Sequence, residues 1–196
     1  MSLEGKRIGL GLTGSHHMYE KVYPQIEKLM DEKAEVIPIV SYTVRNTDTK
    51  HGKAEEHIER VESITGKQVI STIPGAEPLG PKNPLDCMVI APLTGNSLSK
   101  FANALTDNPV LMAAKSTIRN QKPVVLGIST NDALGLNGIN LMRLMATKYI
   151  YFIPYGQDNP YNKPNSLVAN MDYLLPTVES ALNDKQLQPV IIPHIY

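Results

Sequence analysis

Short clusters of glycine, serine, threonine and asparagine follow several apolar runs of this 196-residue chain. Such residues form anion sites where a strand ends and a helix begins, because glycines let backbone N–H groups approach a ligand. Ordinary turns and helix caps favour the same residue types, so one cluster alone carries little weight. Several at equivalent strand ends favour a site for a phosphorylated ligand. The clusters are Thr13-Gly14-Ser15, Ser41-Tyr42-Thr43, Thr94-Gly95-Asn96-Ser97 and Ser129-Thr130-Asn131-Asp132.

Two common phosphate motifs are not satisfied. The first cluster is not followed by the Gly-Lys-Ser/Thr of a P-loop. Gly9, Gly11 and Gly14 have the spacing of a dinucleotide fingerprint, but Gly9 falls inside a predicted strand. The acidic residue that binds the ribose of NAD is replaced by Ser41 at the end of the second strand. A mononucleotide therefore fits better than NAD.

His16 and Asn131 are the candidate catalytic residues. An imidazole next to the first cluster could transfer a proton near pH 7. A solvated pair of turn histidines, His16 and His17, is an equally supported interpretation. His51 and His57 lie in a charged segment and are predicted to be exposed. Adjacent histidines rarely face one ion together, so no metal site is predicted.

Apolar runs alternate with amphipathic stretches along the chain, which is typical of βαβ units. This pattern predicts one α/β domain over residues 1–196, a three-layer Rossmann-like (flavodoxin-like) parallel sheet with helices on both faces. The predicted strands are 7–12, 35–40, 87–91, 124–128 and 149–153, and the predicted helices are 18–32, 54–65, 96–104, 110–119, 137–147 and 173–183. Segments 72–84 and 155–165 are predicted loops, and 189–196 an extended tail.

Composition excludes several other classes of protein. The 19 basic and 19 acidic residues balance, so the basic field that nucleic acid requires is lacking. The single cysteine, Cys87, cannot form an internal disulfide and is predicted to be buried. No apolar run approaches the ~20 residues of a membrane span, and the first residues lack the apolar core of a signal peptide. We therefore expect a cytoplasmic protein with no membrane segment.

Residues 91–108 resemble the flavin-binding signature of the homo-oligomeric flavin-containing cysteine decarboxylases, a family that includes phosphopantothenoylcysteine decarboxylases and flavin prenyltransferases. That signature reads A-P-A-[ST]-[AG]-N-[ST], then a lysine and an alanine, then a late D-N. The matching residues here are Ala91-Pro92-Leu93-Thr94-Gly95-Asn96-Ser97, Lys100, Ala102 and Asp107-Asn108. Segment 11–15, with Tyr19 and Lys21, resembles the family's first phosphate loop. Together with the predicted strand 35–40 and segment 122–125, the likeness covers about residues 5–150.

The resemblance implies FMN as the cofactor and an assembly of identical chains, as trimers or multiples of trimers, because the family usually places its flavin between subunits. It also implies roles for the polar clusters. Thr13, Gly14 and Ser15 would lie against the flavin and phosphate edge, Ser41 against the phosphate or ribityl chain, Thr94, Gly95, Asn96 and Ser97 on the other side, and Ser129, Thr130 and Asn131 along the isoalloxazine.

One departure from the family pattern argues against its usual reaction. The cysteine decarboxylases carry P-x-M-N after the last of these strands, where this chain has Gly127-Ile128-Ser129-Thr130-Asn131-Asp132. A stand-alone FMN-dependent decarboxylase therefore remains only an alternative. A second alternative is a non-catalytic partner that has lost flavin.

Segments 13–16, 131–138, 155–158 and 163–166 carry a closer resemblance to one branch of this family. Its members are flavoprotein-like components of a bacterial synthase made of two different chains. The resemblance implies an oxidoreductase in the mother cell of a spore-forming bacterium, a partner chain that resembles a nicotinamide-dependent dehydrogenase, and a small dicarboxylate substrate. Cations suit carboxylates, and the candidates are Lys100, Arg143, Lys163 and, less favoured, Arg45.

Overall fold

The computed structural model describes residues 3–193, and its centre is a mostly parallel β-sheet. The strands are β1 (Arg7–Leu12), β2 (Glu35–Val40), β3 (Cys87–Leu93), β4 (Val124–Thr130), β5 (Ile150–Phe152), β6 (Tyr155–Gly156) and β7 (Leu167–Ala169). The first five pair in parallel in the order β2-β1-β3-β4-β5. This is the flavodoxin-like order, in which ligands bind at the switch point between β1 and β3.

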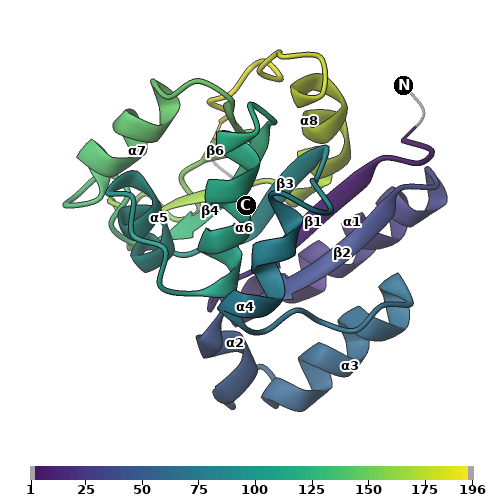
Figure 1. Cartoon of the computed structure of the whole chain (residues 1–196). Helices are drawn as coiled ribbons and strands as arrows, with labels where there is room; N and C mark the ends of the chain where they lie inside the picture. Colours follow the sequence, from purple (N-terminus) through teal and green to yellow (C-terminus); the bar gives the residue numbers. More distant parts are fainter. Residues whose placement is uncertain (1–2, 194–196) are drawn as a thin grey trace.

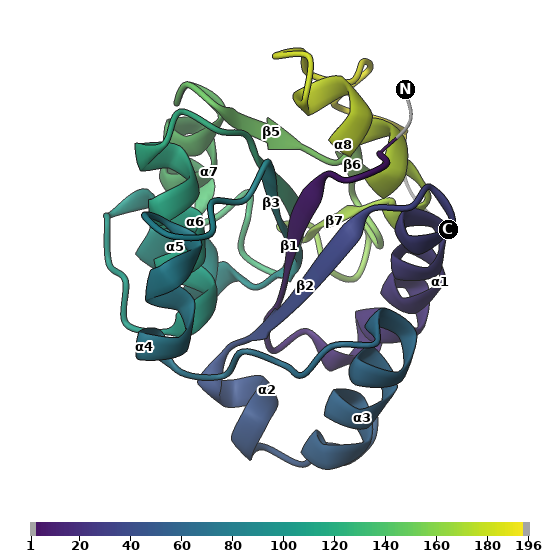
Figure 2. The same cartoon turned by 45° about the vertical axis from the view of Figure 1, so that its right-hand side comes forward.

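Helices cover both faces of the sheet (Figure 1). Helices α1, α3 and α8 lie on one face, and α5, α6 and α7 lie on the other (Figure 2). The predicted fold class is therefore confirmed. The helices are α1 (Tyr19–Asp31), α2 (Tyr42–Asn46), α3 (Ala54–Thr65), α4 (Ile73–Ala76), α5 (Gly95–Ala102), α6 (Pro109–Arg119), α7 (Gly138–Met145) and α8 (Leu174–Ala181), with 3-10 turns at His16–Met18, Glu77–Leu79 and Met171–Tyr173.

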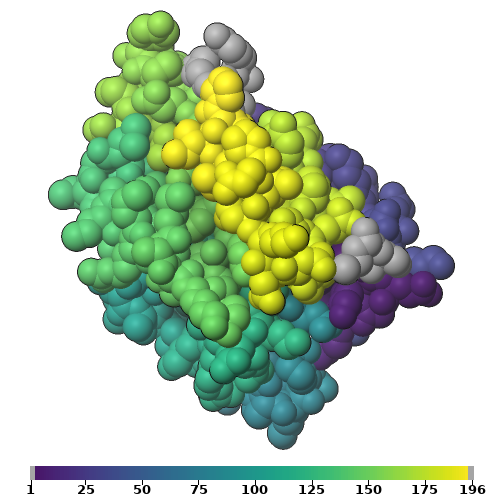
Figure 3. All heavy atoms as spheres, turned by 90° about the horizontal axis from the view of Figure 1, so that it is seen from above, coloured from purple at the N-terminus to yellow at the C-terminus, as the bar shows by residue number. Residues whose placement is uncertain are grey.

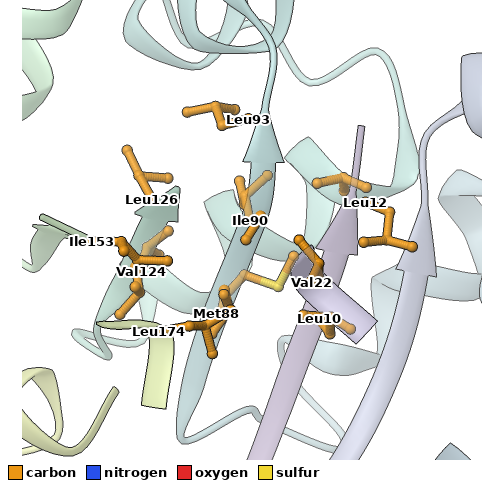
Figure 4. Close-up of a cluster of buried hydrophobic side chains, with 14 of the residues drawn as sticks. Leu10, Leu12, Val22, Met88, Ile90, Leu93, Val124, Leu126, Ile153 and Leu174 are labelled. Carbon is orange, nitrogen blue, oxygen red and sulfur yellow. The ribbon is translucent and has the colours of Figure 1, made fainter. Parts of the chain in front are cut away.

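The core lies between the sheet and these helices. Every residue of β3 and β4 is buried, as expected for central strands covered on both faces. Met88 and Ile90 of β3 pair with Gly9 and Gly11 of β1, while Leu10 pairs with Val89. Because side chains alternate along a strand, Leu10 lies on the opposite face of the sheet from Met88 and Ile90, and all three are buried (Figure 4). Full burial of one such side chain stabilises the fold by about 1.5–3 kcal/mol.

The sheet also has an antiparallel extension that the sequence did not predict. The last two residues of β4, Ser129 and Thr130, pair antiparallel with β7, which pairs with β6. Both strands are too short for a period-2 pattern, and β6 falls inside the predicted loop 155–165. The C-terminal segment, yellow in Figure 3, lies beside the green segment near residue 150, where Tyr155 bridges Ile191.

Other differences from the predicted elements are local. Strands β3 and β4 each run two residues further, to Leu93 and Thr130, and α2 follows β2 directly. The predicted loop 72–84 contains α4, which begins where the Thr72 hydroxyl accepts a hydrogen bond from the Gly75 N–H. The predicted tail is described only to residue 193, and its remainder lies outside the described residues. Among residues 3–193, no helix has both the length and the apolar character to cross a membrane.

Candidate functional site

Two adjoining cavities lie at the carboxyl ends of β1, β2, β3 and β4, and they share Asn96. The first has a volume of about 300 Å³ and is lined by Gly14, Ser41, Tyr42, Thr43, Thr94, Asn96, Ser97, Lys100, Asp107 and Asn108. The second has a volume of about 630 Å³ and is lined by Ser15, His17, Lys50, His51, Gly95, Asn96, Ser129, Thr130, Asn131, Asp132, Asp158, Lys163 and Val168. All four predicted polar clusters therefore meet at one edge of the sheet.

The loop after β1 is fastened to its neighbours by hydrogen bonds. The Thr13 hydroxyl donates to the Pro92 carbonyl at 2.7 Å and accepts from the Thr94 N–H at 2.9 Å. The Ser15 hydroxyl donates to the Ser129 carbonyl at 3.2 Å. Thr13 lines neither cavity, so its side chain positions the loops after β1 and β3.

The first cavity offers donors to an anion. Thr94 caps α5, since its hydroxyl oxygen accepts from the Ser97 N–H at 3.3 Å. Among the described residues, the N–H groups of Gly95 and Asn96, in the first turn of α5, have no protein acceptor. Lys100 adds a cation that is shared with Asp107, and the hydrogen bond from Lys100 holds the pKa of the Asp107 carboxyl below its usual value.

Ser41 is the residue that best fits a phosphorylated ligand. Its hydroxyl oxygen is buried at the wall of the first cavity and has no hydrogen-bond partner among the described residues. Leaving a buried polar group unpaired costs about 1–3 kcal/mol. A phosphate oxygen in this cavity would supply the partner, so the residues present fit a phosphorylated cofactor such as FMN.

The floor of the second cavity is polar and uncharged. Ser15, Ser129 and Thr130 are buried there, while Asn131 is exposed. At one side of this floor, Asp132 is held by the Thr130 hydroxyl and by the Asn137 amide, whose Nδ2 donates at 2.8 Å. A Cβ atom on Gly95 would lie 2.4 Å from Thr130 Oγ1, so only glycine lets α5 begin against this loop.

The two adjacent histidines are placed differently. His16 is buried and lines neither cavity, and its Nδ1 donates to the Gly14 carbonyl at 2.8 Å. His17 is exposed and lines the second cavity. The prediction that His57 is exposed is wrong: its ring is buried, 5.7 Å from that of His16, and shares a 2.8 Å hydrogen bond with the Tyr23 hydroxyl. Burial, and then His16, lower the pKa of His57.

The structure separates the predicted carboxylate-binding cations. Lys163 lines the second cavity and Lys100 the first. Arg143 lies outside both and donates to Asn103 Oδ1 at 2.7 Å. Arg45 lines a separate groove among acidic residues.

The sequence reasoning missed Lys50, His51 and Asp158 as lining residues. Lys50 and His51 lie in the turn between α2 and α3, and Asp158 follows β6. In the sequence, these three residues differ from their neighbours only in being polar residues of loops, and most loops are polar. Their common position depends on the tertiary fold.

Comparisons with known proteins show which family this chain resembles. The sequence model of the family described as Flavoprotein matches residues 1–164. The B-subunit of dipicolinate synthase from Bacillus subtilis (strain 168) is 65% identical over 191 residues, which are 97% of this chain and 96% of that protein. The crystal structure of the corresponding B-subunit from Bacillus halodurans is 62% identical, covers 100% of both chains and has a TM-score of 0.92.

A more distant structure shares the fold alone. The FMN-dependent cysteine decarboxylase SpaF is 15% identical, with a TM-score of 0.65, over 93% of this chain and 98% of that chain. The family resemblance and the closer resemblance to one branch of the family, both expected from the sequence, are confirmed by these comparisons.

Proposed function

Because this chain belongs to the flavoprotein family and is a close relative of the B-subunit of dipicolinate synthase, we propose that it is the FMN-binding component of such a synthase. It acts with the dehydrogenase-like A-subunit of the synthase to make dipicolinate from an intermediate of the dihydrodipicolinate pathway. The setting is the cytoplasm of the mother cell during sporulation. The support is the 65% identity over nearly the whole length of both proteins.

The single observation that carries FMN binding is the buried hydroxyl of Ser41, which lies directly after β2 in the first cavity and has no hydrogen-bond partner within residues 3–193. Around it lie the N–H groups that open α5 and the Lys100 ammonium. A phosphate monoester would contact all three, and its negative charge suits a helix N-terminus. The uncharged floor of the second cavity, with Ser15, Ser129 and Thr130, is then left for a ring system.

FMN, when bound, supplies an acceptor for the hydride that a dihydropyridine ring loses on becoming aromatic. The residues of this chain bind and orient the reactants. Thr13 and Ser15 join the loops after β1, β3 and β4, so that the walls of both cavities keep one relative position. Asn131, exposed in the second cavity, is available to donate a hydrogen bond to a substrate.

The stand-alone decarboxylase is disfavoured by the loop after β4. When the family's P-x-M-N is aligned on Asn131, Ile128 stands in place of the proline and Thr130 in place of the methionine. The Thr130 hydroxyl is engaged with Asp132. We expect no release of carbon dioxide from peptides that end in cysteine. A measurable release by this chain alone would overturn the synthase proposal.

The test begins with FMN binding. The purified chain is incubated with FMN and desalted, and its visible absorbance is recorded beside that of Ser41→Ala. We expect the wild-type protein to retain flavin and Ser41→Ala to bind it about tenfold or more weakly, because a hydrogen bond to a charged phosphate is lost. The control is Ser63→Ala, which removes an exposed hydroxyl on α3, outside both cavities.

The second part measures dipicolinate formation by the dehydrogenase-like component, with and without this chain. Formation that requires both the chain and FMN is the expected result. A requirement for the chain but no titration by FMN would instead identify a non-catalytic partner. An equal rate of dipicolinate formation without the chain would rule out both the FMN-binding component and the non-catalytic partner.

A further inference from the structure

The exposed edge of the second cavity carries four basic side chains from three separate segments. We call His17, Lys50, His51 and Lys163 the basic rim. His17 comes from the 3-10 turn after β1, Lys50 and His51 from the turn between α2 and α3, and Lys163 from the segment between β6 and β7. All four are exposed, whereas Ser15, Ser129 and Thr130 are buried in the floor below.

Backbone hydrogen bonds hold the rim in place. Thr49 and Gly52 exchange N–H to carbonyl bonds of 3.0 and 3.2 Å, so Lys50 and His51 occupy the tip of a tight turn. The Lys163 N–H donates to the Asn159 carbonyl at 2.7 Å. The ring centroids of His17 and His51 are 6.1 Å apart. Both imidazoles are therefore presented to the same part of the cavity.

The charges of the cavity depend on the two imidazoles. Lys50 and Lys163 oppose Asp132 and Asp158, and Lys163 Nζ lies 3.5 Å from Asp158 Oδ2. The lining is thus close to neutral when His17 and His51 are neutral, and it gains two positive charges when both are protonated. That charge complements a ligand with two carboxylates.

We propose that the basic rim is a dicarboxylate-binding site, in which His17 and His51 together with Lys50 and Lys163 contact the two carboxylates of a small planar ligand lying over the uncharged floor. The assignment rests on the proposed function, since the floor is where the flavin ring is expected, and it deepens that function by locating the substrate. The ligand class is a ring dicarboxylate, and dipicolinate itself is the probe.

Binding is linked to proton uptake. Burial, then His51, Lys163 and Lys21, lower the pKa of His17, while Asp158 opposes them. A bound dicarboxylate places negative charge beside the His17 imidazole and raises its pKa. The complex then holds more protons than the free protein, so affinity increases as pH falls from 8 towards the ordinary histidine value of 6.5.

The test is calorimetric titration of the full chain with dipicolinate in EDTA-containing buffer, at several pH values. Benzene-1,3-dicarboxylate, which lacks the chelating ring nitrogen, and pyridine-2-carboxylate, which lacks one carboxylate, are the comparison ligands. We expect both dicarboxylates to bind, the monocarboxylate to bind at least about tenfold more weakly, and dicarboxylate affinity to rise as pH falls.

The variant that tests the rim is His17→Gln with His51→Gln. Because both side chains are exposed, the fold should persist, and we expect dicarboxylate affinity to fall at least about tenfold and to lose its pH dependence. Lys50→Gln should weaken binding, while Lys115→Gln, which removes an exposed charge from α6, should leave it within about twofold. Unchanged affinity in the double variant, or no binding of dipicolinate with or without the dehydrogenase-like component, would overturn the proposal.

A parallel FMN titration separates this site from the proposed function. Dicarboxylate binding by a chain that never binds FMN would support the rim and contradict the flavin proposal. FMN binding with no dicarboxylate binding would support the flavin proposal and contradict the assignment of the basic rim.

Discussion

At the scale of single residues, the site depends on side chains that are small rather than reactive. Gly95 begins α5 where a Cβ would meet Thr130 Oγ1 at 2.4 Å and Asp132 Oδ1 at 2.8 Å. Ser41 and Thr13 act through their hydroxyl groups. That of Ser41 has no partner in the described part of the chain, and that of Thr13 joins two loops. His16, a candidate catalytic residue in the sequence, is packed against Tyr19 and His57. The shape of the crevice is therefore set by glycine and hydroxyl positions.

The Gly95→Ala variant tests whether a glycine position sets the shape of the crevice. The added methyl group must displace the Thr130 and Asp132 side chains, which form the wall shared by α5 and the second cavity, so we expect FMN affinity to fall about tenfold, equivalent to about 1.4 kcal/mol. Gly138→Ala is the matched control, because Gly138 begins α7 and its Cβ would meet the Ala133 carbonyl at an ordinary 3.4 Å. Fluorescence titration with FMN measures both. Equal affinity in the two variants would show that this wall does not contact the cofactor.

At the scale of elements, the residues that cap the first turns of α5 and α6 serve both the fold and the candidate site. Thr94 caps α5, and Asn108 caps α6 by accepting a hydrogen bond from the Leu111 N–H at 3.2 Å. Both residues belong to the motif that resembles the flavin signature. The late D-N of that motif thus has a structural role, in which Asn108 caps a helix and Asp107 pairs with Lys100.

Asn108→Ala should destabilise the flavin-free protein by about 0.5–2 kcal/mol, the usual cost of losing an N-cap side chain. Asn108→Asp keeps an acceptor at the same position and should retain most of the stability. Urea unfolding followed by circular dichroism measures the difference. An alanine variant as stable as the aspartate variant would mean that α6 is held by packing alone.

At the scale of the whole molecule, apolar side chains are exposed around α7. Leu136, just before α7, is 91% exposed, and Ile139 and Met142 on α7 are 68% and 53% exposed. Contiguous exposed apolar side chains often mark an interaction surface. This surface supports the proposal, first implied by the family resemblance, that identical chains assemble.

We expect light scattering to give a trimer or a multiple of a trimer for the wild-type chain, and smaller species for Ile139→Asp. An aspartate buried where two chains meet is costly because its charge loses water. Lys115→Gln serves again as a control for a changed surface charge. A monomeric wild-type chain would contradict the assembly proposal, and an unchanged oligomer in Ile139→Asp would place the interface elsewhere.

The sequence by itself determined the layered fold and the edge where the site lies. The boundaries of β1 and β2 agree with prediction because their flanking residues change sharply in polarity, and the clusters after β1, β2, β3 and β4 meet because the carboxyl ends of parallel strands share one edge. Only the tertiary structure decided which polar residues face a cavity. It buried His16 and His57, paired β7 antiparallel with the end of β4, and brought Lys50, His51 and Lys163 beside His17. Those outcomes depend on contacts between segments far apart in the chain, which local residue patterns do not encode.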